Sequence, residues 1–220
     1  MSAGTVLLWR HGRTAHNVTA RIQGQIDIPL DDIGSRQAHA AAAALVATTK
    51  PAAIVVSDLG RAGTTAGFLA ELTGLEPAVD PRVRERGFGL WEGLTGEEIS
   101  AGWANEYAAW RTGKEPENVG AESRIAVATR MLEAIADHAE RLGEHDVLVV
   151  VSHGAAITLA VTALLGLDVA RWRGIAGLTN AHWTELRRNR AGAEPAWRLV
   201  GHDLGPSTSI DDWNAGTDLV

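Results

Sequence analysis

Two histidines of this chain each follow a run of apolar residues and precede a glycine. His11 stands in Arg-His-Gly at 10–12, and His153 stands in Ser-His-Gly at 152–154. A third apolar run is followed a few residues later by Arg61. A neutral imidazole can act as a nucleophile, and a guanidinium group binds phosphate oxygens through a fixed fork of charged donors. These residue types together indicate the transfer of a phosphoryl group.

Transfer from an alkyl phosphate also needs a group that protonates the leaving oxygen. Glu85 and Glu92 both lie in the segment 84–93 (Arg-Glu-Arg-Gly-Phe-Gly-Leu-Trp-Glu-Gly) and are candidates. A carboxylic acid with a raised pKa contributes about 10² to 10⁴ in rate in such a role. Composition alone does not choose between the two. Taken singly, each histidine is more often structural and each glutamate more often solvated, so the hypothesis depends on the combination.

Several other classes of site and partner are not favoured by the sequence. It contains no cysteine, which excludes thiolate nucleophiles, disulfides and cysteine zinc sites. It has no His-x-x-x-His pair or carboxylate-rich cluster, so we expect no metal and no cofactor. The net charge of −7, without a basic stripe, argues against nucleic acid as a partner. No run approaches the ~18 apolar residues of a membrane span, and no basic signal region precedes the first apolar run. We expect a cytoplasmic protein.

The elements that must position these residues alternate between strand and helix. Buried strands are predicted at 5–9, 52–57 and 147–151, a short strand at 77–83, and two late strands at 182–187 and 197–202. Helices are predicted at 35–48, 61–72, 97–110, 121–142 and 155–165. Apolar strands without alternation indicate a largely parallel sheet covered on both faces, in an α/β fold. Ligands bind outside the carboxyl ends of such strands, so the histidines and arginines are expected on one rim.

The length of 220 residues suits a single domain, 1–220, and no repeat or linker divides it. Residues 86–122 have the least regular pattern and are expected to form a small inserted lid. The polar tail from residue 203 is expected to wrap the surface.

Separate motifs in this chain resemble those of the histidine phosphatase superfamily, also called the phosphoglycerate mutase-like family. They occur in the family's order: Arg-His-Gly-Arg-Thr-Ala-His-Asn at 10–17, Gly-Gln-Ile-Asp-Ile-Pro-Leu at 24–30, Ser-Asp-Leu-Gly-Arg-Ala-Gly-Thr-Thr-Ala at 57–66, Glu85 with Phe-Gly-Leu-Trp-Glu-Gly at 88–93, and Val-Ser-His-Gly at 151–154.

The resemblance implies a three-layer αβα sandwich with a metal-free site. It implies that His11 becomes a phosphohistidine and that Glu85, rather than Glu92, is the proton donor and then the base that activates water. Three residues would form the phosphate pocket: Arg10, Arg61 and His153. Four more would contribute to substrate binding: Asn17, Gln23, Gly24 and Gly154.

The chain departs from the family at a few positions around the expected pocket. Gly-Ala-Glu-Ser stands at 120–123 where Gly-Gly-Glu-Ser is common, and Ala155 replaces a second glycine. His182 stands where a small hydroxyl residue is commoner. It is therefore a candidate substrate contact, with a structural role at the start of a strand as the alternative.

The resemblance favours a phosphomonoester hydrolase. A mutase of the phosphoglycerate type is the alternative, although such mutases tend to carry a larger insertion over the site. A non-catalytic binding protein would not need all five reactive residues. The length and the segment 179–184 look similar to phosphatases of glucosyl-3-phosphoglycerate, whose carboxylate Arg13 or Arg86 would bind. Other sugar phosphates, phosphoserine and phosphoglycerate stay open as small-metabolite partners. The family often dimerises, so a homodimer is compatible with the resemblance.

Overall fold

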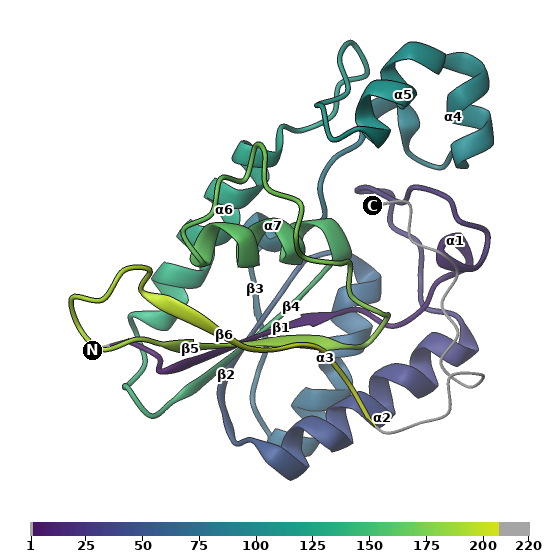
Figure 1. The fold of residues 1–220 in the computed structure, drawn as a ribbon. Coiled ribbons are helices and arrows are strands. Elements are labelled where there is room, and N and C mark those ends of the chain that lie inside the picture. The colour runs from purple at the N-terminus through teal and green to yellow at the C-terminus, as the bar shows by residue number, and fades with distance from the viewer. Residues whose placement is uncertain (1, 207–220) are drawn as a thin grey trace.

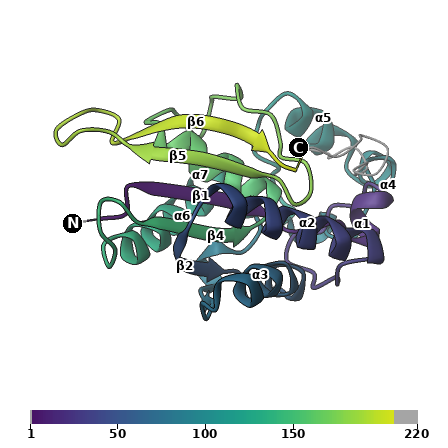
Figure 2. The same ribbon diagram turned by 90° about the horizontal axis from the view of Figure 1, so that it is seen from below.

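Six strands form one sheet in the order β3-β2-β4-β1-β5-β6 in a computed structural model that describes residues 2–206 (Figures 1 and 2). The strands are β1 (Thr5–Arg10), β2 (Pro51–Val56), β3 (Ala78–Val79), β4 (Val147–Ser152), β5 (Trp183–Arg188) and β6 (Trp197–Leu204). The first four in the sheet order are parallel to one another, whereas β5 and β6 pair antiparallel. The predicted largely parallel sheet is therefore confirmed, with an antiparallel hairpin at one edge.

Helices cover both faces of this sheet. The helices α2 (Asp32–Thr48) and α3 (Gly60–Thr73) cover one face, and α6 (Arg124–Ala139) and α7 (Gly154–Leu164) cover the other (Figure 1). The shorter helices are α1 (Ala15–Val18), α4 (Gly96–Gly102) and α5 (Ala104–Arg111), with 3₁₀ turns η1 (Pro81–Val83) and η2 (Gly89–Trp91). The arrangement is the expected αβα sandwich.

Consecutive residues of the central strands pack into two different cores. In β1, Val6 and Leu8 belong to the core beneath α6 and α7, whereas Leu7 and Trp9 belong to the core beneath α2 and α3. The residues of β4 divide in the same way. Both sides of each strand are apolar because both faces of the sheet are covered, which is why the runs lack alternation.

Some predicted elements differ from the observed ones. The helix predicted at 97–110 is two helices that meet at Trp103, whose backbone leaves the helical region. The strand predicted at 77–83 is only two residues long, and a 3₁₀ turn with Pro81 at its start follows it. The helix predicted from 121 begins at Arg124, because the Ser123 hydroxyl accepts a hydrogen bond from the backbone and caps it. Most of the predicted tail lies outside the described residues.

The segment 86–122 contributes most of a third, separate cluster of apolar side chains. Its buried members are Ile22, Phe88, Trp91, Ile99, Trp110 and Val119. Figure 1 shows α4 and α5 at the same end of the sheet as α1, beside the carboxyl ends of the parallel strands. Within residues 2–206, each helix is too short or too polar to cross a membrane.

Candidate active site

Three adjacent strand ends bring two imidazoles and a guanidinium group together. His11 follows β1 and His153 follows β4, and their ring centroids are 5.1 Å apart. Arg61 lies in the first turn of α3, after β2. Its Nε atom is 3.3 Å from His11 Nε2 and 3.2 Å from His153 Nδ1. All three side chains are buried, so the structure brings these predicted residues together on one rim.

The ring of His11 is oriented by its own backbone. Its Nδ1 lies 2.7 Å from the carbonyl oxygen of Gly12, so the hydrogen-bond pattern assigns the proton to Nδ1 and the lone pair to Nε2. Burial lowers the pKa of His11 well below its usual value, and the charges of Arg61 and Arg10 lower it further. The imidazole is therefore neutral near pH 7, with Nε2 available as a nucleophile.

His153 is neutral for the same reasons. Burial lowers its pKa, followed by the charge of Arg61. Its Nε2 lies 2.9 Å from the hydroxyl of Ser57, so its Nδ1 faces Arg61. Burial lowers the pKa of Arg61 to about 10, which leaves the group charged at neutral pH.

Arg61 also fixes the loop that follows the first motif. Its Nη1 donates to Ile26 O at 2.7 Å and its Nη2 donates to Gly24 O at 2.8 Å. Arg10 donates from Nη1 to Leu178 O, and a Cβ atom at Gly154 would lie 3.5 Å from Arg10 Nε. The start of α7 therefore lies beside the guanidinium group, at a distance where an added Cβ would make an ordinary van der Waals contact.

The carboxyl group of Glu85 lies at the N-terminus of α7. Its Oε1 accepts from the backbone N–H of Arg86 at 2.8 Å and of Ala156 at 2.9 Å, and its Oε2 accepts from Ala155 at 3.3 Å. Glu92 has different surroundings, since its Oε1 accepts from the backbone of Gln25 at 3.1 Å and of Phe88 at 2.8 Å. Glu92 thus ties two loops together, whereas Glu85 faces the cavity described below.

Two amide side chains share one buried threonine. The Thr14 hydroxyl lies 2.9 Å from Gln23 Oε1 and 3.1 Å from Asn17 Oδ1. Asn17 Oδ1 also accepts from the Thr14 backbone and from Asn180 Nδ2. Because both amide oxygens are used in this way, the NH₂ groups of Asn17 and Gln23 are the parts that can donate to a phosphate.

These residues surround a cavity of about 70 Å³. Its lining consists of Arg10, His11, His16, Asn17, Ala20, Arg21, Ile22, Gln23, Gly24, Arg61, Glu85, Phe88, Gly154 and Ala155. The volume is a little more than twice the space of one water molecule, which suits a phosphoryl group.

Four predicted site residues are not part of this lining. His153 lies behind Arg61 and contacts it directly. Arg13 Nε pairs with Asp31 Oδ2 at 2.9 Å, and His182 Nδ1 lies 3.1 Å from the carbonyl of Asn180. Arg86 lines an adjoining cavity instead.

Several residues of this site are not predicted from the sequence. His16 and Arg21 form part of the wall of the catalytic cavity. Partial burial lowers the pKa of His16, and the charge of Arg21 lowers it further. Asn180 is buried and donates to the backbone oxygen of His11 as well as to Asn17. His16 lies within the first motif and Asn180 within the segment 179–184, which is the only signal that could have found them.

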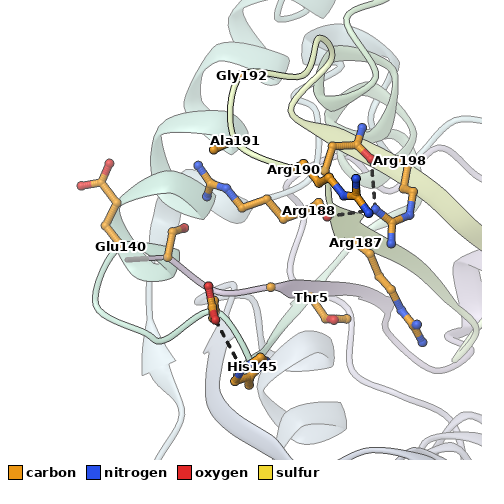
Figure 3. Close-up of a pocket in the computed structure, with 13 residues that line it drawn as sticks. Thr5, Glu140, His145, Arg187, Arg188, Arg190, Ala191, Gly192 and Arg198 are labelled. Atoms are coloured by element: carbon orange, nitrogen blue, oxygen red, sulfur yellow. Dashed lines mark hydrogen bonds and ion pairs between the residues drawn. The ribbon is translucent and has the colours of Figure 1, made fainter.

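A larger open depression of about 1210 Å³ lies at the other end of the sheet, around the start of β1 and the end of β5 (Figure 3). Figure 3 shows the side chains of Arg187 and Arg188 pointing in different directions, so they do not converge on one anion. Arg187 is also paired with Glu185 at 2.7 Å. In the described part of the chain, no three His, Asp or Glu side chains are grouped to hold a metal ion.

The family is decided by a match over residues 6–200 to the histidine phosphatase superfamily (branch 1). The chain belongs to this superfamily. It is 38% identical to glucosyl-3-phosphoglycerate phosphatase of Mycobacterium tuberculosis, over 100% of this chain and 98% of that protein. The solved structure of a mycobacterial glucosyl-3-phosphoglycerate phosphatase superposes with a TM-score of 0.82 at 37% identity, over 92% of this chain and 99% of that one. A probable phosphoglycerate mutase of Yersinia enterocolitica is 36% identical over 74% of this chain and 75% of its own length. This histidine phosphatase is therefore an enzyme that acts on a small phosphorylated substrate.

Proposed function

We propose that this histidine phosphatase hydrolyses a phosphomonoester without a metal, through a phosphohistidine at His11, and that glucosyl-3-phosphoglycerate is its foremost substrate. The observation that carries the mechanism is the position of His11 Nε2. This nitrogen, which carries the lone pair, accepts a long hydrogen bond of 3.3 Å from Arg61 Nε, in a buried site where the imidazole is neutral.

In the first step, His11 Nε2 attacks phosphorus. A P–N bond forms, the ester P–O bond breaks, and Glu85 gives its proton to the leaving alkoxide. Arg10 and Arg61 stabilise the charge that grows on the phosphoryl oxygens, and the NH₂ groups of Asn17 and Gln23 donate to the same oxygens. Because these donors are held by buried contacts, little reorganisation is needed.

In the second step, a water molecule attacks the phosphohistidine. The ionised Glu85 removes a proton from the water, a new P–O bond forms, and the P–N bond returns its electron pair to His11. Inorganic phosphate then leaves, and Glu85 carries the proton for the next cycle. The two steps together consume one water molecule and leave the enzyme unchanged.

The full-length similarity to the glucosyl-3-phosphoglycerate phosphatases supports the choice of substrate. The similarity to a probable phosphoglycerate mutase spans less of the chain. We therefore favour water over a second hydroxyl as the phosphoryl acceptor. The segment 86–122, which has its own apolar cluster, is proposed to act as the lid of a single domain. A homodimer and a cytoplasmic location stay predictions, which gel filtration and cell fractionation test.

The test is phosphate release in EDTA from glucosyl-3-phosphoglycerate, 3-phosphoglycerate, glycerol 3-phosphate, phosphoserine and p-nitrophenyl phosphate. We expect the wild type to release phosphate, with the highest kcat/KM on glucosyl-3-phosphoglycerate. The variant His11→Ala should be inactive while keeping its melting temperature to within a few degrees.

Acid quenching during turnover should destroy any labelled enzyme intermediate, whereas alkaline quenching should preserve it, because a phosphoramidate is acid-labile. Interconversion of phosphoglycerates without phosphate release would instead identify a mutase. Loss of activity in EDTA that is restored by a divalent metal would overturn the metal-free mechanism.

A further inference from the structure

A second cavity, of about 330 Å³, adjoins the catalytic one. The two cavities share Phe88 and Ala155 in their walls. The second one is here called the side cavity, and besides these two residues its lining includes Arg86, Trp110, Arg124, Thr158, Trp172 and Arg173. Its volume lies within the ~300–1,000 Å³ that is usual for small-molecule sites. The catalytic cavity has room for a phosphoryl group, and the side cavity has room for the remainder of a metabolite.

The side cavity begins where the leaving group must emerge. Glu85 lines the catalytic cavity, and its neighbour in the chain, Arg86, lines the side cavity. Helix α7 forms a continuous wall, since Gly154 faces the first cavity and Thr158 faces the second. An alkoxide that takes its proton from Glu85 is therefore attached to a group at the entrance of the side cavity.

Positive charge is concentrated in the side cavity. Three arginines from different elements line it. Arg86 lies in the loop after η1, Arg124 begins α6, and Arg173 lies in the loop after α7. Arg86 and Arg124 are buried. Arg124 Nη1 and Arg173 Nη2 both donate to the carbonyl of Gly113, at 2.5 and 2.7 Å. Two guanidinium groups on one carbonyl oxygen lie close enough to repel each other.

One carboxylate side chain is paired with this group. Glu115 Oε2 accepts from Arg86 Nη2 at 2.5 Å, and Glu115 Oε1 accepts from the backbone of Arg124. Burial and then the neighbouring charge of Arg173 lower the pKa of Arg124 to about 10, with Glu115 opposing. Glu85 and Glu122 also act on Arg86, so the positive charge in excess lies at Arg124 and Arg173, and an additional anion would be stabilised beside them.

An indole ring completes the wall. Trp172 is 37% exposed, and its ring lies against the backbone of Gly174, where a Cβ atom would come within 2.5 Å of Cζ2. Trp110 lines the same cavity and is buried. A sugar ring or a short carbon chain has an apolar face that can pack on such an indole ring.

We propose that the side cavity binds the alcohol half of the substrate, that Arg124 with Arg86 recognises a carboxylate on it, and that Trp172 packs against its carbon skeleton. This inference rests on the proposed hydrolase function. It names the substrate class as phosphomonoesters whose leaving group carries a second negative charge. The arginines of the side cavity would then recognise that charge, rather than Arg13, which is paired with Asp31.

The decisive experiment compares two substrates that differ in that charge. 3-Phosphoglycerate carries a carboxylate where glycerol 3-phosphate carries a hydroxymethyl group, and p-nitrophenyl phosphate carries neither. The variants are Arg124→Gln, Arg124→Lys and Trp172→Ala. The matched control is Arg190→Gln, because Arg190 is exposed and lines the distant depression in Figure 3.

We expect Arg124→Gln to lower kcat/KM for 3-phosphoglycerate by about tenfold to 100-fold, mainly through KM, as for loss of a charge-assisted hydrogen bond. We expect kcat/KM for glycerol 3-phosphate and for p-nitrophenyl phosphate to change by about twofold at most in this variant. Arg124→Lys should recover part of the loss, because it keeps the charge. Trp172→Ala should lower kcat/KM for both 3-phosphoglycerate and glycerol 3-phosphate. Arg190→Gln should leave kcat/KM for all three substrates unchanged.

Equal losses on all three substrates would mean that Arg124 only supports the fold, and would overturn the proposal. So would a wild type that hydrolyses 3-phosphoglycerate and glycerol 3-phosphate equally well. If Arg124→Gln did not fold, Trp172→Ala would decide, since its activity on the glycerol-based substrates should fall while that on p-nitrophenyl phosphate holds. A wild type that releases no phosphate even from p-nitrophenyl phosphate would instead overturn the hydrolase function itself.

Discussion

The carboxyl group of Glu85 is held by three backbone N–H groups and so has one defined position relative to His11. We predict that Glu85→Gln, which keeps the shape but cannot give up a proton, lowers kcat/KM by about 10² to 10⁴ on an alkyl phosphate. On p-nitrophenyl phosphate, whose leaving group needs no protonation, the loss in kcat/KM should be less than about tenfold, because kcat/KM reports the formation of the phosphohistidine and not its hydrolysis. Steady-state kinetics on both substrates measure this. The exposed Glu97→Gln is the control, and equal losses on both substrates would contradict the proposed role.

Much of this site could be predicted from the sequence because strand ends in a parallel sheet share one rim. The sequence therefore predicts that His11, Arg61 and His153 lie together. It could not show that Thr14 orients the amides of Asn17 and Gln23, because such hydrogen bonds depend on tertiary contacts between side chains. For the same reason it could not show that Arg13 turns toward Asp31.

The loop after β1 reaches its place through contact between two backbones. A Cβ atom at Gly12 would lie 2.3 Å from the carbonyl oxygen of Gly34, at the start of α2. We predict that Gly12→Ala displaces His11 and lowers kcat/KM by at least about tenfold, with a loss of stability above ~1 kcal/mol. Gly67 offers a matched contrast, since it lies inside α3 with nothing within 4 Å of an added Cβ. Gly67→Ala should stabilise the protein by about 0.5–1 kcal/mol and leave kcat/KM unchanged.

Urea unfolding and phosphate release on the two variants check this prediction. If Gly12→Ala matched the wild type in both measurements, the close approach of the loop after β1 to the start of α2 would not matter for the site. Most helices and strands could be predicted from the sequence, because the apolar periodicity of each is strong. It missed the break at Trp103, where the pattern of Ile99, Trp103, Tyr107 and Trp110 continues through two helices that share one cluster.

The whole molecule keeps two neutral histidines inside a positively charged site. Burial and the nearby arginines lower the pKa values of both His11 and His153 below the 6.5 expected for the unfolded chain. Below pH 6.5 the unfolded state therefore binds more protons than the folded state. Since the free energy of unfolding rises with pH wherever the unfolded state binds more protons, it must fall as the pH drops below 6.5. Well above pH 6.5, both states leave the two imidazoles neutral, so these residues add no pH dependence to the free energy of unfolding.

We predict that the free energy of unfolding falls between pH 6.5 and pH 5.5 by as much as about 1 kcal/mol for each of the two histidines, and that it is nearly flat with respect to them between pH 7 and pH 8. Urea unfolding at these four pH values measures it. His153→Gln should reduce the slope below pH 6.5. His145→Gln, at a side chain that is 93% exposed, should leave the slope unchanged. The carboxylate of Asp80 does not interfere, because its lowered pKa of about 2 affects stability only below about pH 4. Equal wild-type stability at pH 5.5 and pH 7 would mean that folding does not lower the pKa values of His11 and His153, and would contradict the effect of burial and of the nearby arginines on the two imidazoles.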